Sequence, residues 1–367
     1  MTISSKNLYC RDNQLFILLV LWQIFTFIYY FVSPYSARLT NVGYLLIATL
    51  SFYLLPQILF FNFGAILRKE VLAKVALFYV HINLFAIIIG TIDFFTLKLL
   101  YRAPHILGVI PLNGYFRMQS YFGTPMITGC VCATSLLISV ALIQNKFRKF
   151  IFAFVFLLGL MLTMARGAWV AGLISLGYYL FMSKSIKVKL SLRVIGFIIM
   201  LIVFLIIFSN QLYNYFNSEN FVQLQTRFRH LSTASEERKH QWINGINVFL
   251  KYPWGVGYGL LTHKGIMSNF GIRVPDGNYF RILGELGVIG FSLFVSILTY
   301  AIYISHKRRY YIVTALLIIY CIQAIGTNVL DLAYTSFLFW LLIGFSLNIN
   351  QKEGLSQIQA NDRNSNP

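Results

Sequence analysis

The chain has 367 residues, of which 58% are hydrophobic and only 11% are charged, a composition typical of an integral membrane protein and not of a soluble domain. A formal net charge of +19 would indicate nucleic-acid binding in a soluble protein. More than half of the Lys and Arg residues lie, however, in segments that the topology below assigns to the cytoplasm, where basic residues are required for orientation. Nucleic acid is therefore not an expected partner.

Apolar runs of about 18 to 25 residues recur along the chain, which is enough to cross about 30 Å of hydrocarbon as helix. A run such as VIGFIIMLIVFLIIF, residues 194–208, is apolar on every face, whereas a membrane strand would alternate. The first run is too long for a removable signal peptide. The sequence predicts an all-α polytopic membrane protein with about ten transmembrane helices, over residues 14–32, 42–63, 72–95, 120–143, 150–165, 167–183, 194–211, 286–305, 312–328 and 331–348.

Basic residues in the short connections orient these spans. Under an alternating count, four basic connections fall on one side of the membrane, and the positive-inside rule assigns that side to the cytoplasm together with both termini. The four connections carry Arg68, Lys69 and Lys74, then Lys146, Arg148 and Lys149, then Lys184, Lys187, Lys189 and Arg193, and finally Lys307, Arg308 and Arg309.

The long segment between the seventh and eighth spans then faces outward. We expect helices 1–7 in residues 1–211, an outer, periplasmic-side loop with the active site in 212–285, helices 8–10 in 286–348, and a disordered cytoplasmic tail in 349–367. Basic residues in this loop indicate an anionic partner, such as a lipid pyrophosphate or an acidic sugar; contact with lipid headgroups is the alternative. They are Arg227, Arg229, Arg238, Lys239, Lys251, Lys264, Arg273 and Arg281.

The outer loop is expected to be partly helical. In STASEERKHQWINGINVFLKYPWGVGYG, Thr233 and Glu236 fit a capping box, and the helical pattern continues until Pro253. The glycines that follow predict a tight turn and not a nucleotide loop, because no strand precedes them and no Lys-Ser/Thr follows. In VPDGNYFRILGELGVIGF, a turn at Asp276 precedes a helix that starts near Asn278 and enters the membrane.

Three polar residues, Asn278, Arg281 and Glu285, fall on one side of that helix. Glu285 has two interpretations: an ion pair with Arg281 four residues earlier, or a direct functional role. The outer loop contains no cysteine and no histidines with ligand spacing, and its carboxylates are not grouped for a divalent ion. No metal and no other cofactor is therefore expected.

Four segments in a fixed order carry a family resemblance: NGYFRMQSYFGTP, MARGAW, SEERKHQWINGINVFLKYPWGVGYG and DGNYFRILGELGVIG. Over residues 105–300, the chain resembles the O-antigen ligase and O-antigen polymerase superfamily of bacterial envelope proteins. The resemblance implies a multi-pass glycosyltransferase of the bacterial cytoplasmic (inner) membrane that uses sugars attached to polyprenyl (undecaprenyl) pyrophosphate. It also implies that arginines near the outer membrane face hold the pyrophosphate, and the matching positions are Arg117, Arg166 and Arg238.

Arg166 is the one charge in MLTMARGAWVAGLISL, and an arginine inside a bilayer is costly unless it reaches water, a partner or an anion. The interpretation that agrees with the family is an anion holder at the outer end of its span, since guanidinium groups bind phosphate oxygens bidentately. The alternative is that Arg166 snorkels to lipid headgroups or pairs with a carbonyl.

Asp276 occupies the position where ligases of the superfamily carry a histidine, and this favours a polymerase. As a catalytic residue it would act as general base toward the acceptor hydroxyl; as a structural residue it would cap the next helix. Glu285 is the second catalytic candidate. Arg281, Trp242 and Tyr279 are the candidates for contacts with the sugar substrate.

The function expected from these observations is that of an O-antigen, capsule or exopolysaccharide polymerase, which transfers a growing glycan from polyprenyl pyrophosphate to an incoming lipid-linked repeat unit. One alternative is an O-antigen ligase, which transfers the finished glycan to the lipid A core of lipopolysaccharide. Another is a flippase or transporter for the same lipid-linked oligosaccharides. The expected partners are polyprenyl-pyrophosphate-linked oligosaccharides, membrane lipids, a chain-length regulator and a flippase.

Overall fold

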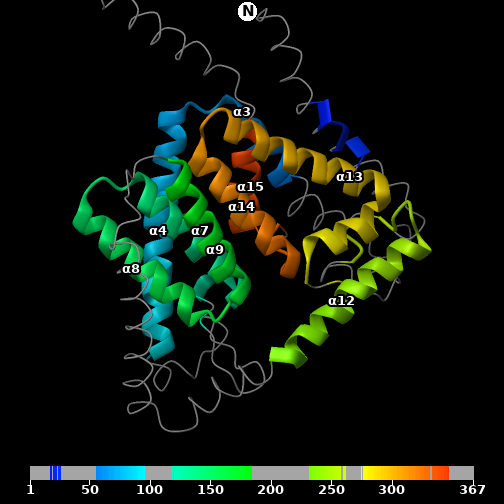
Figure 1. Cartoon of the computed structure of the whole chain (residues 1–367), viewed down its shortest axis with the longest axis horizontal. Helices are drawn as coiled ribbons and strands as arrows, with labels where there is room; N and C mark the ends of the chain where they lie inside the picture. The colour runs from blue at the N-terminus through cyan, green and yellow to red at the C-terminus, as the bar shows by residue number, and fades with distance from the viewer. Residues whose placement is uncertain are drawn as a thin grey trace, which may run out of the picture.

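The computed structural model describes part of the chain, and within that part it is helical and contains no strand (Figure 1). The described residues are 17–18, 20–22, 24–25, 55–95, 118, 120–183, 231–257, 259–261, 274, 276–330 and 333–346. The predicted span 194–211 and the predicted tail 349–367 lie outside them, and the predicted spans 14–32 and 42–63 are covered only in part. The all-α class is confirmed over the described residues.

The helices follow the predicted apolar runs closely. Three of them, α4, α7 and α13, are long and apolar enough to cross a membrane, and α3, α14 and α15 contain shorter apolar segments. The elements are α3 (Leu55–Ile66), α4 (Lys69–Phe95), the 3₁₀ turn η2 (Ser120–Phe122), α7 (Pro125–Leu142), α8 (Lys146–Leu162), α9 (Arg166–Met182), α12 (Leu231–Lys251), α13 (Asn278–Lys307), α14 (Tyr311–Gly326) and α15 (Ala333–Ser346).

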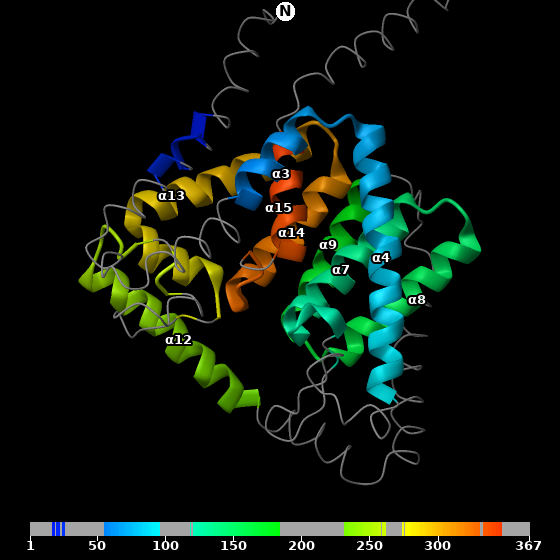
Figure 2. The same ribbon diagram turned by 180° about the vertical axis from the view of Figure 1, so that it is seen from behind.

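The ends of α12 and α13 test the expectations for the outer loop. Helix α13 begins at Asn278, as predicted. Helix α12 ends two residues before Pro253, because the residue before a proline is disfavoured in the helical region. It begins at Leu231, so Thr233 lies inside the helix and not at the predicted cap. In Figures 1 and 2, α12 lies at the margin of the bundle, and its first residues extend away from the other described helices.

The helix directions place three of the basic connections at one end of the bundle. Helices α7 and α9 run parallel, since Gly129 meets Ala168 and Gly172 meets Ala133. Near the C-terminal end of α9, the Tyr178 hydroxyl lies 2.6 Å from His306 Nδ1 at the C-terminal end of α13.

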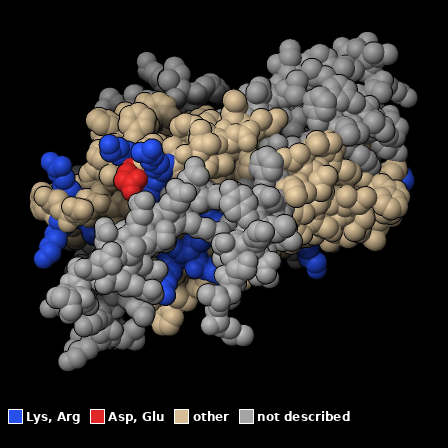
Figure 3. Space-filling view, turned by 90° about the horizontal axis from the view of Figure 1, so that it is seen from above, with Lys and Arg blue, Asp and Glu red and all other residues tan. Residues whose placement is uncertain are grey.

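Helices α4 and α8 run the opposite way and begin at that same end: Tyr79 of α4 contacts Thr134 of α7, and His81 of α4 packs on Phe152 of α8. The connections before α4, before α8 and after α13 therefore share one end. Seen from that end in Figure 3, basic side chains gather with an acidic group among them. Their assignment to the cytoplasm stays a prediction.

Small residues allow the helices to pack closely. Helix α7 is central, with 78% of its span buried, whereas α4 is peripheral, with 33% buried. The closest approach is the crossing of α3 and α15, where a Cβ on Gly64 would overlap the carbonyl oxygen of Leu341 and a Cβ on Gly344 would overlap that of Phe61. Van der Waals packing at small residues is a main source of helix association in membranes.

We expect Gly344→Ala to destabilise the protein, because the added methyl group must push α3 and α15 apart. The melting temperature of the purified protein in detergent is the measurement, and a drop of several degrees corresponds to the loss of about 1–3 kcal/mol typical of overpacking. Gly177→Ala is the matched control, because a Cβ at Gly177 meets no atom within 4 Å. Equal melting temperatures for the two variants would contradict the close crossing.

Candidate active site

Helix α13 is broken at Gly287, its tenth residue. The residue has φ 63° and ψ −164°, so the carbonyl groups of Gly284 and Glu285 lose the partners that a continuous helix would supply. The turn that follows α12 supplies them instead. Val256 N donates to Gly284 O at 3.1 Å, Gly257 N donates to Glu285 O at 2.9 Å, and Val288 N donates to Pro253 O at 3.0 Å.

Two glycines make this docking possible. Gly287 and Gly255 both have positive φ, at 63° and 90°. A Cβ on Gly287 would overlap the backbone of Trp254, and a Cβ on Gly255 would overlap Glu285 O. The turn predicted for PWGVGYG is present, and its glycines serve the close contact between residues 253–257 and the break in α13.

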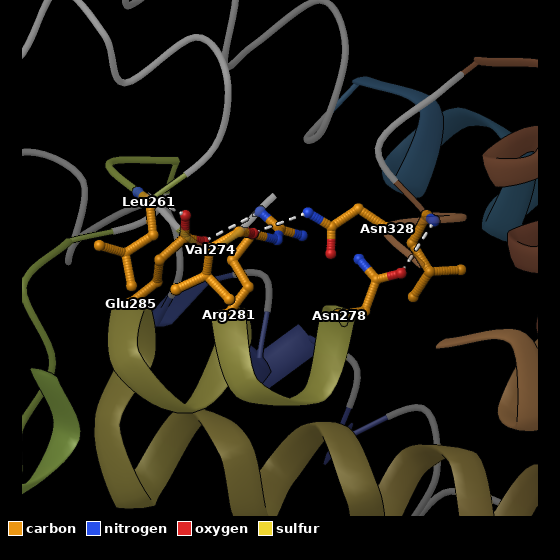
Figure 4. A network of polar contacts seen from close by, with 7 residues as sticks. Leu261, Val274, Asn278, Arg281, Glu285 and Asn328 are labelled. Atoms are coloured by element: carbon orange, nitrogen blue, oxygen red, sulfur yellow. Dashed lines mark hydrogen bonds and ion pairs between the residues drawn. The ribbon is translucent and has the colours of Figure 1, made fainter. Parts of the chain in front are cut away.

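A buried ion pair between two side chains lies in the segment of α13 before the break. Arg281 Nη1 lies 3.0 Å from Glu285 Oε2, and the side chains are 1% and 0% exposed. Glu285 Oε1 accepts a hydrogen bond of 3.0 Å from Leu261 N (Figure 4). The ion pair expected as one interpretation of Glu285 is thus present, and both carboxylate oxygens are engaged. The catalytic role of Glu285 stays a prediction.

Three hydrogen bonds hold the start of α13, and Val274 before it, on α14 and on the connection between α14 and α15. Asn278 Oδ1 accepts from Leu330 N at 3.2 Å, and Asn328 Nδ2 donates to Val274 O at 3.0 Å (Figure 4). The Tyr279 hydroxyl donates to Cys321 O at 3.2 Å. Polar atoms of α13 thus bind the last turn of α14 and the connection to α15.

Two other helices begin at the end of α14. At the start of α7, Met126 Sδ lies 3.4 Å from Thr327 Oγ1. At the start of α9, a Cβ on Gly167 would lie 3.7 Å from Gln323 Oε1. The N-terminal ends of α7, α9 and α13 therefore surround the C-terminal part of α14, at the end of the bundle opposite the basic connections. Helix N-termini carry a partial positive charge and exposed N–H donors, which favours an anion there.

Of the arginines and the aspartate predicted for the site, Arg166, Asp276 and Arg281 are described with their side chains, whereas Arg117 and the side chain of Arg238 are not. Arg166 is the first residue of α9 and is half-buried. Asp276 is half-buried in the turn before α13, and Arg281 lies in the first turns of that helix. Arg117 lies outside the described residues, and the side chain of Arg238 in α12 is not described.

Two candidates for sugar contacts make protein contacts instead. The Trp242 ring stacks on Phe280 with centroids 5.1 Å apart and planes at 16°, and the Tyr279 hydroxyl is engaged with α14. One face of the Trp242 ring is therefore occupied by α13. Their contact with substrate stays a prediction, whereas their contribution to holding α12 and α14 on α13 is visible.

Sequence reasoning missed two polar residues of this region. Gln323 and Asn328 lie within and just after an apolar helix, and they are 3% and 8% exposed. Gln323 Nε2 is buried and has no hydrogen-bond partner among the described residues. A polar side chain inside a predicted span is itself a signal of function, and this signal was available in the sequence as IIYCIQAIGTN.

The helical structure is consistent with what a comparison with known protein families finds. The apolar helices define an integral membrane protein. Residues 151–295 match the family model described as O-antigen ligase, a range that runs from α8 through the break in α13. Over this range the chain is therefore similar to the O-antigen ligase and polymerase superfamily, which supports the resemblance carried by the sequence motifs. A search of curated proteins gives no match.

We expect Glu285→Gln to destabilise the protein strongly, because the amide cannot neutralise the buried Arg281. Breaking a buried ion pair from one side costs about 3–5 kcal/mol. The double variant Arg281→Gln, Glu285→Gln should lose less than the sum of the single variants, since the two residues are coupled.

Thermal or denaturant unfolding of the purified protein is the measurement, and Glu70→Gln is the control, since Glu70 is exposed at the opposite end. A Glu285→Gln protein as stable as the control would show that the ion pair contributes little.

Proposed function

We propose that this protein is a polymerase of an envelope polysaccharide. It transfers a growing glycan from its polyprenyl pyrophosphate to a hydroxyl group on the incoming lipid-linked repeat unit, on the outer face of the cytoplasmic membrane. The observation that carries the proposal is the position of Arg166 at the start of α9, beside the end of α14 where the turn and first residues of α13 also lie. Arg166 and the first residues of α13 fall within the family match, whereas α14 lies beyond it.

The leaving group determines what the site must supply. Transfer from the anomeric carbon builds negative charge on the departing pyrophosphate, and preorganised donors that face this charge lower the barrier. Arg166 offers a planar guanidinium, and the N-terminal end of α9 adds backbone N–H groups and a partial positive charge. Gln323 Nε2, buried beside the start of α9, is a further donor at this location.

The acceptor hydroxyl needs a base. Asp276 lies in the turn at the start of α13, is half-buried, and occupies the position where ligases of the superfamily carry a histidine. We assign it the role of general base. Glu285 is the second carboxylate, but both of its oxygens hold Arg281 and Leu261 in place, so its contribution is to position the start of α13.

Ligase activity is the second candidate, because the matching family model is described as O-antigen ligase. The presence of Asp276 at the ligase histidine position favours the polymerase. The glycan profile of a deletion strain separates the candidates. Glycans reduced to a single repeat unit indicate a polymerase, and a normal ladder left on the lipid carrier indicates a ligase. Lipid-linked units trapped inside the cell would indicate a flippase and contradict both.

Arg166 provides the test of the proposed chemistry. If the guanidinium binds pyrophosphate through two donors, Arg166→Lys keeps the charge but loses the geometry and should lose much of the activity. Arg166→Ala should lower activity by about 100-fold or more, as is usual when a donor to a developing anion is removed. The measurement is the chain-length distribution in a deletion strain complemented with each variant at equal membrane abundance.

Arg148→Lys is the control, because Arg148 is exposed in the first turn of α8 at the opposite end. Normal chain lengths from the Arg166→Lys variant would mean that Arg166 only snorkels to headgroups, since lysine does so equally well.

A further inference from the structure

Helix α12 is apolar on two opposite faces, and only one of them is covered. The inner face packs on α13: a Cβ on Gly245 would lie 2.9 Å from Phe280 O, and the Trp242 ring stacks on Phe280. Val248, on the same face, is 2% exposed and belongs to a small cluster with Val256, Leu260, Leu261 and Val274. The contacts of this face attach α12 to the first part of α13.

The opposite face carries large apolar side chains that are exposed. Ile243, Ile246 and Leu250 are separated by three and four residues, which aligns them along one side of the helix. They are 38%, 37% and 67% exposed, and Trp254, in the turn after the helix, is 65% exposed. We call these four residues the α12 apolar face. Such a row on a helix facing water would be unfavourable, because each side chain loses the gain from burial.

The α12 apolar face continues into the surface of a membrane-spanning helix. The backbone of Trp254 contacts Gly287, and Val288 N donates to Pro253 O at 3.0 Å. Val288 and Ile289 are both 44% exposed and are the first exposed apolar residues of α13 after its break. The exposed surface of α13 beyond the break belongs to a candidate membrane span. Trp254 therefore lies where the lipid-facing surface of α13 begins.

Among the described side chains of α12, both exposed charges next to this face are basic. Lys239 and Lys251 of α12 are exposed, and Lys251 Nζ lies 5.4 Å from the centroid of the Tyr252 ring. Basic residues near a bilayer are attracted to anionic phospholipids, and tryptophan and tyrosine are enriched at the level of the headgroups. An amphipathic helix with a basic flank, Ile, Leu and Trp on one side and a direct connection to a span has the features of a helix that lies in a membrane surface.

We propose that α12 is such an interfacial helix and that the α12 apolar face is immersed in the phospholipid of the bilayer, next to the entry of α13. The inner face holds the start of α13, so the lipid contact fixes the height of residues 253–257 and of the break at the membrane surface. The proposal needs no assumption about the reaction that the protein catalyses.

Quenching by brominated lipid tests the position of the face directly. A cysteine is introduced at Leu250, labelled with a small fluorophore, and the full-length protein is reconstituted in phosphatidylethanolamine–phosphatidylglycerol vesicles with or without brominated acyl chains. Cys10 and the half-buried Cys321 are first replaced by serine in all variants, whereas Cys130 and Cys132 are buried and are kept. We expect the label at Leu250→Cys to be quenched by brominated lipid to more than half the extent seen at Phe85→Cys, which is 71% exposed in the middle of α4.

Asn244→Cys is the matched control, since Asn244 is exposed on the same helix but lies about 120° around its axis from Leu250. Its label should be quenched at least two-fold less by lipid and more by aqueous iodide. Ile243→Cys gives a second reading of the face and should follow Leu250→Cys. Equal lipid quenching at positions 250 and 244 would overturn the proposal, as would cross-linking through position 250 between two copies of the chain in place of quenching.

Discussion

The candidate active site depends on one constraint: the backbone polar groups at the break in α13 must form hydrogen bonds with other parts of the protein. A carbonyl group that is buried away from water costs several kcal/mol when it has no hydrogen-bond partner. At Gly287 the missing bonds are replaced by Val256 N, Gly257 N and Pro253 O. The turn after α12 thus supplies hydrogen bonds that a continuous α13 would have made within itself. The ion pair of Arg281 and Glu285 lies in the short helical segment that this arrangement creates.

The short segment of α13 before the break explains how charged residues come to lie deep in an apolar protein. Residues 278–286 form two turns of helix with a new direction, and their polar atoms meet the end of α14 through Asn278 and Tyr279. Arg281 and Glu285 neutralise one another, while Leu261 N satisfies a second carboxylate oxygen. Arg166, at the start of α9, and Asp276, in the turn before α13, are half-buried.

The proposed interfacial position of α12 connects this region to the membrane surface. A substrate with a polyprenyl tail has its pyrophosphate at the headgroup level, so an enzyme for it must hold its anion site at that height. A helix that contacts α13 on one side and phospholipid on the other would achieve this without additional domains. The break in α13, the docked turn and α12 would then act as one unit whose depth is set by the lipid.

Several properties of the protein were determined by the sequence alone. Hydrophobic runs of membrane length predicted the helical class. The turn at Asp276 predicted the start of α13 near Asn278, and the glycines predicted the turn in PWGVGYG, because local backbone preference decides these features. The (i, i+4) spacing of Arg281 and Glu285 predicted their ion pair as one of two interpretations. The motif order predicted the superfamily, which the match over residues 151–295 confirms.

Only the tertiary structure decided how these parts combine. No local pattern indicates that Gly287 interrupts α13, that Gly255 fits against it, or that Gln323 and Asn328 of a distant span lie beside the starts of α9 and α13. These contacts join residues far apart in the chain, and each depends on the approach of two backbones within van der Waals distance. Sequence spacing reports on neighbours along one helix, whereas the fit between helices follows from shape and from hydrogen bonds that exist only once the bundle has packed.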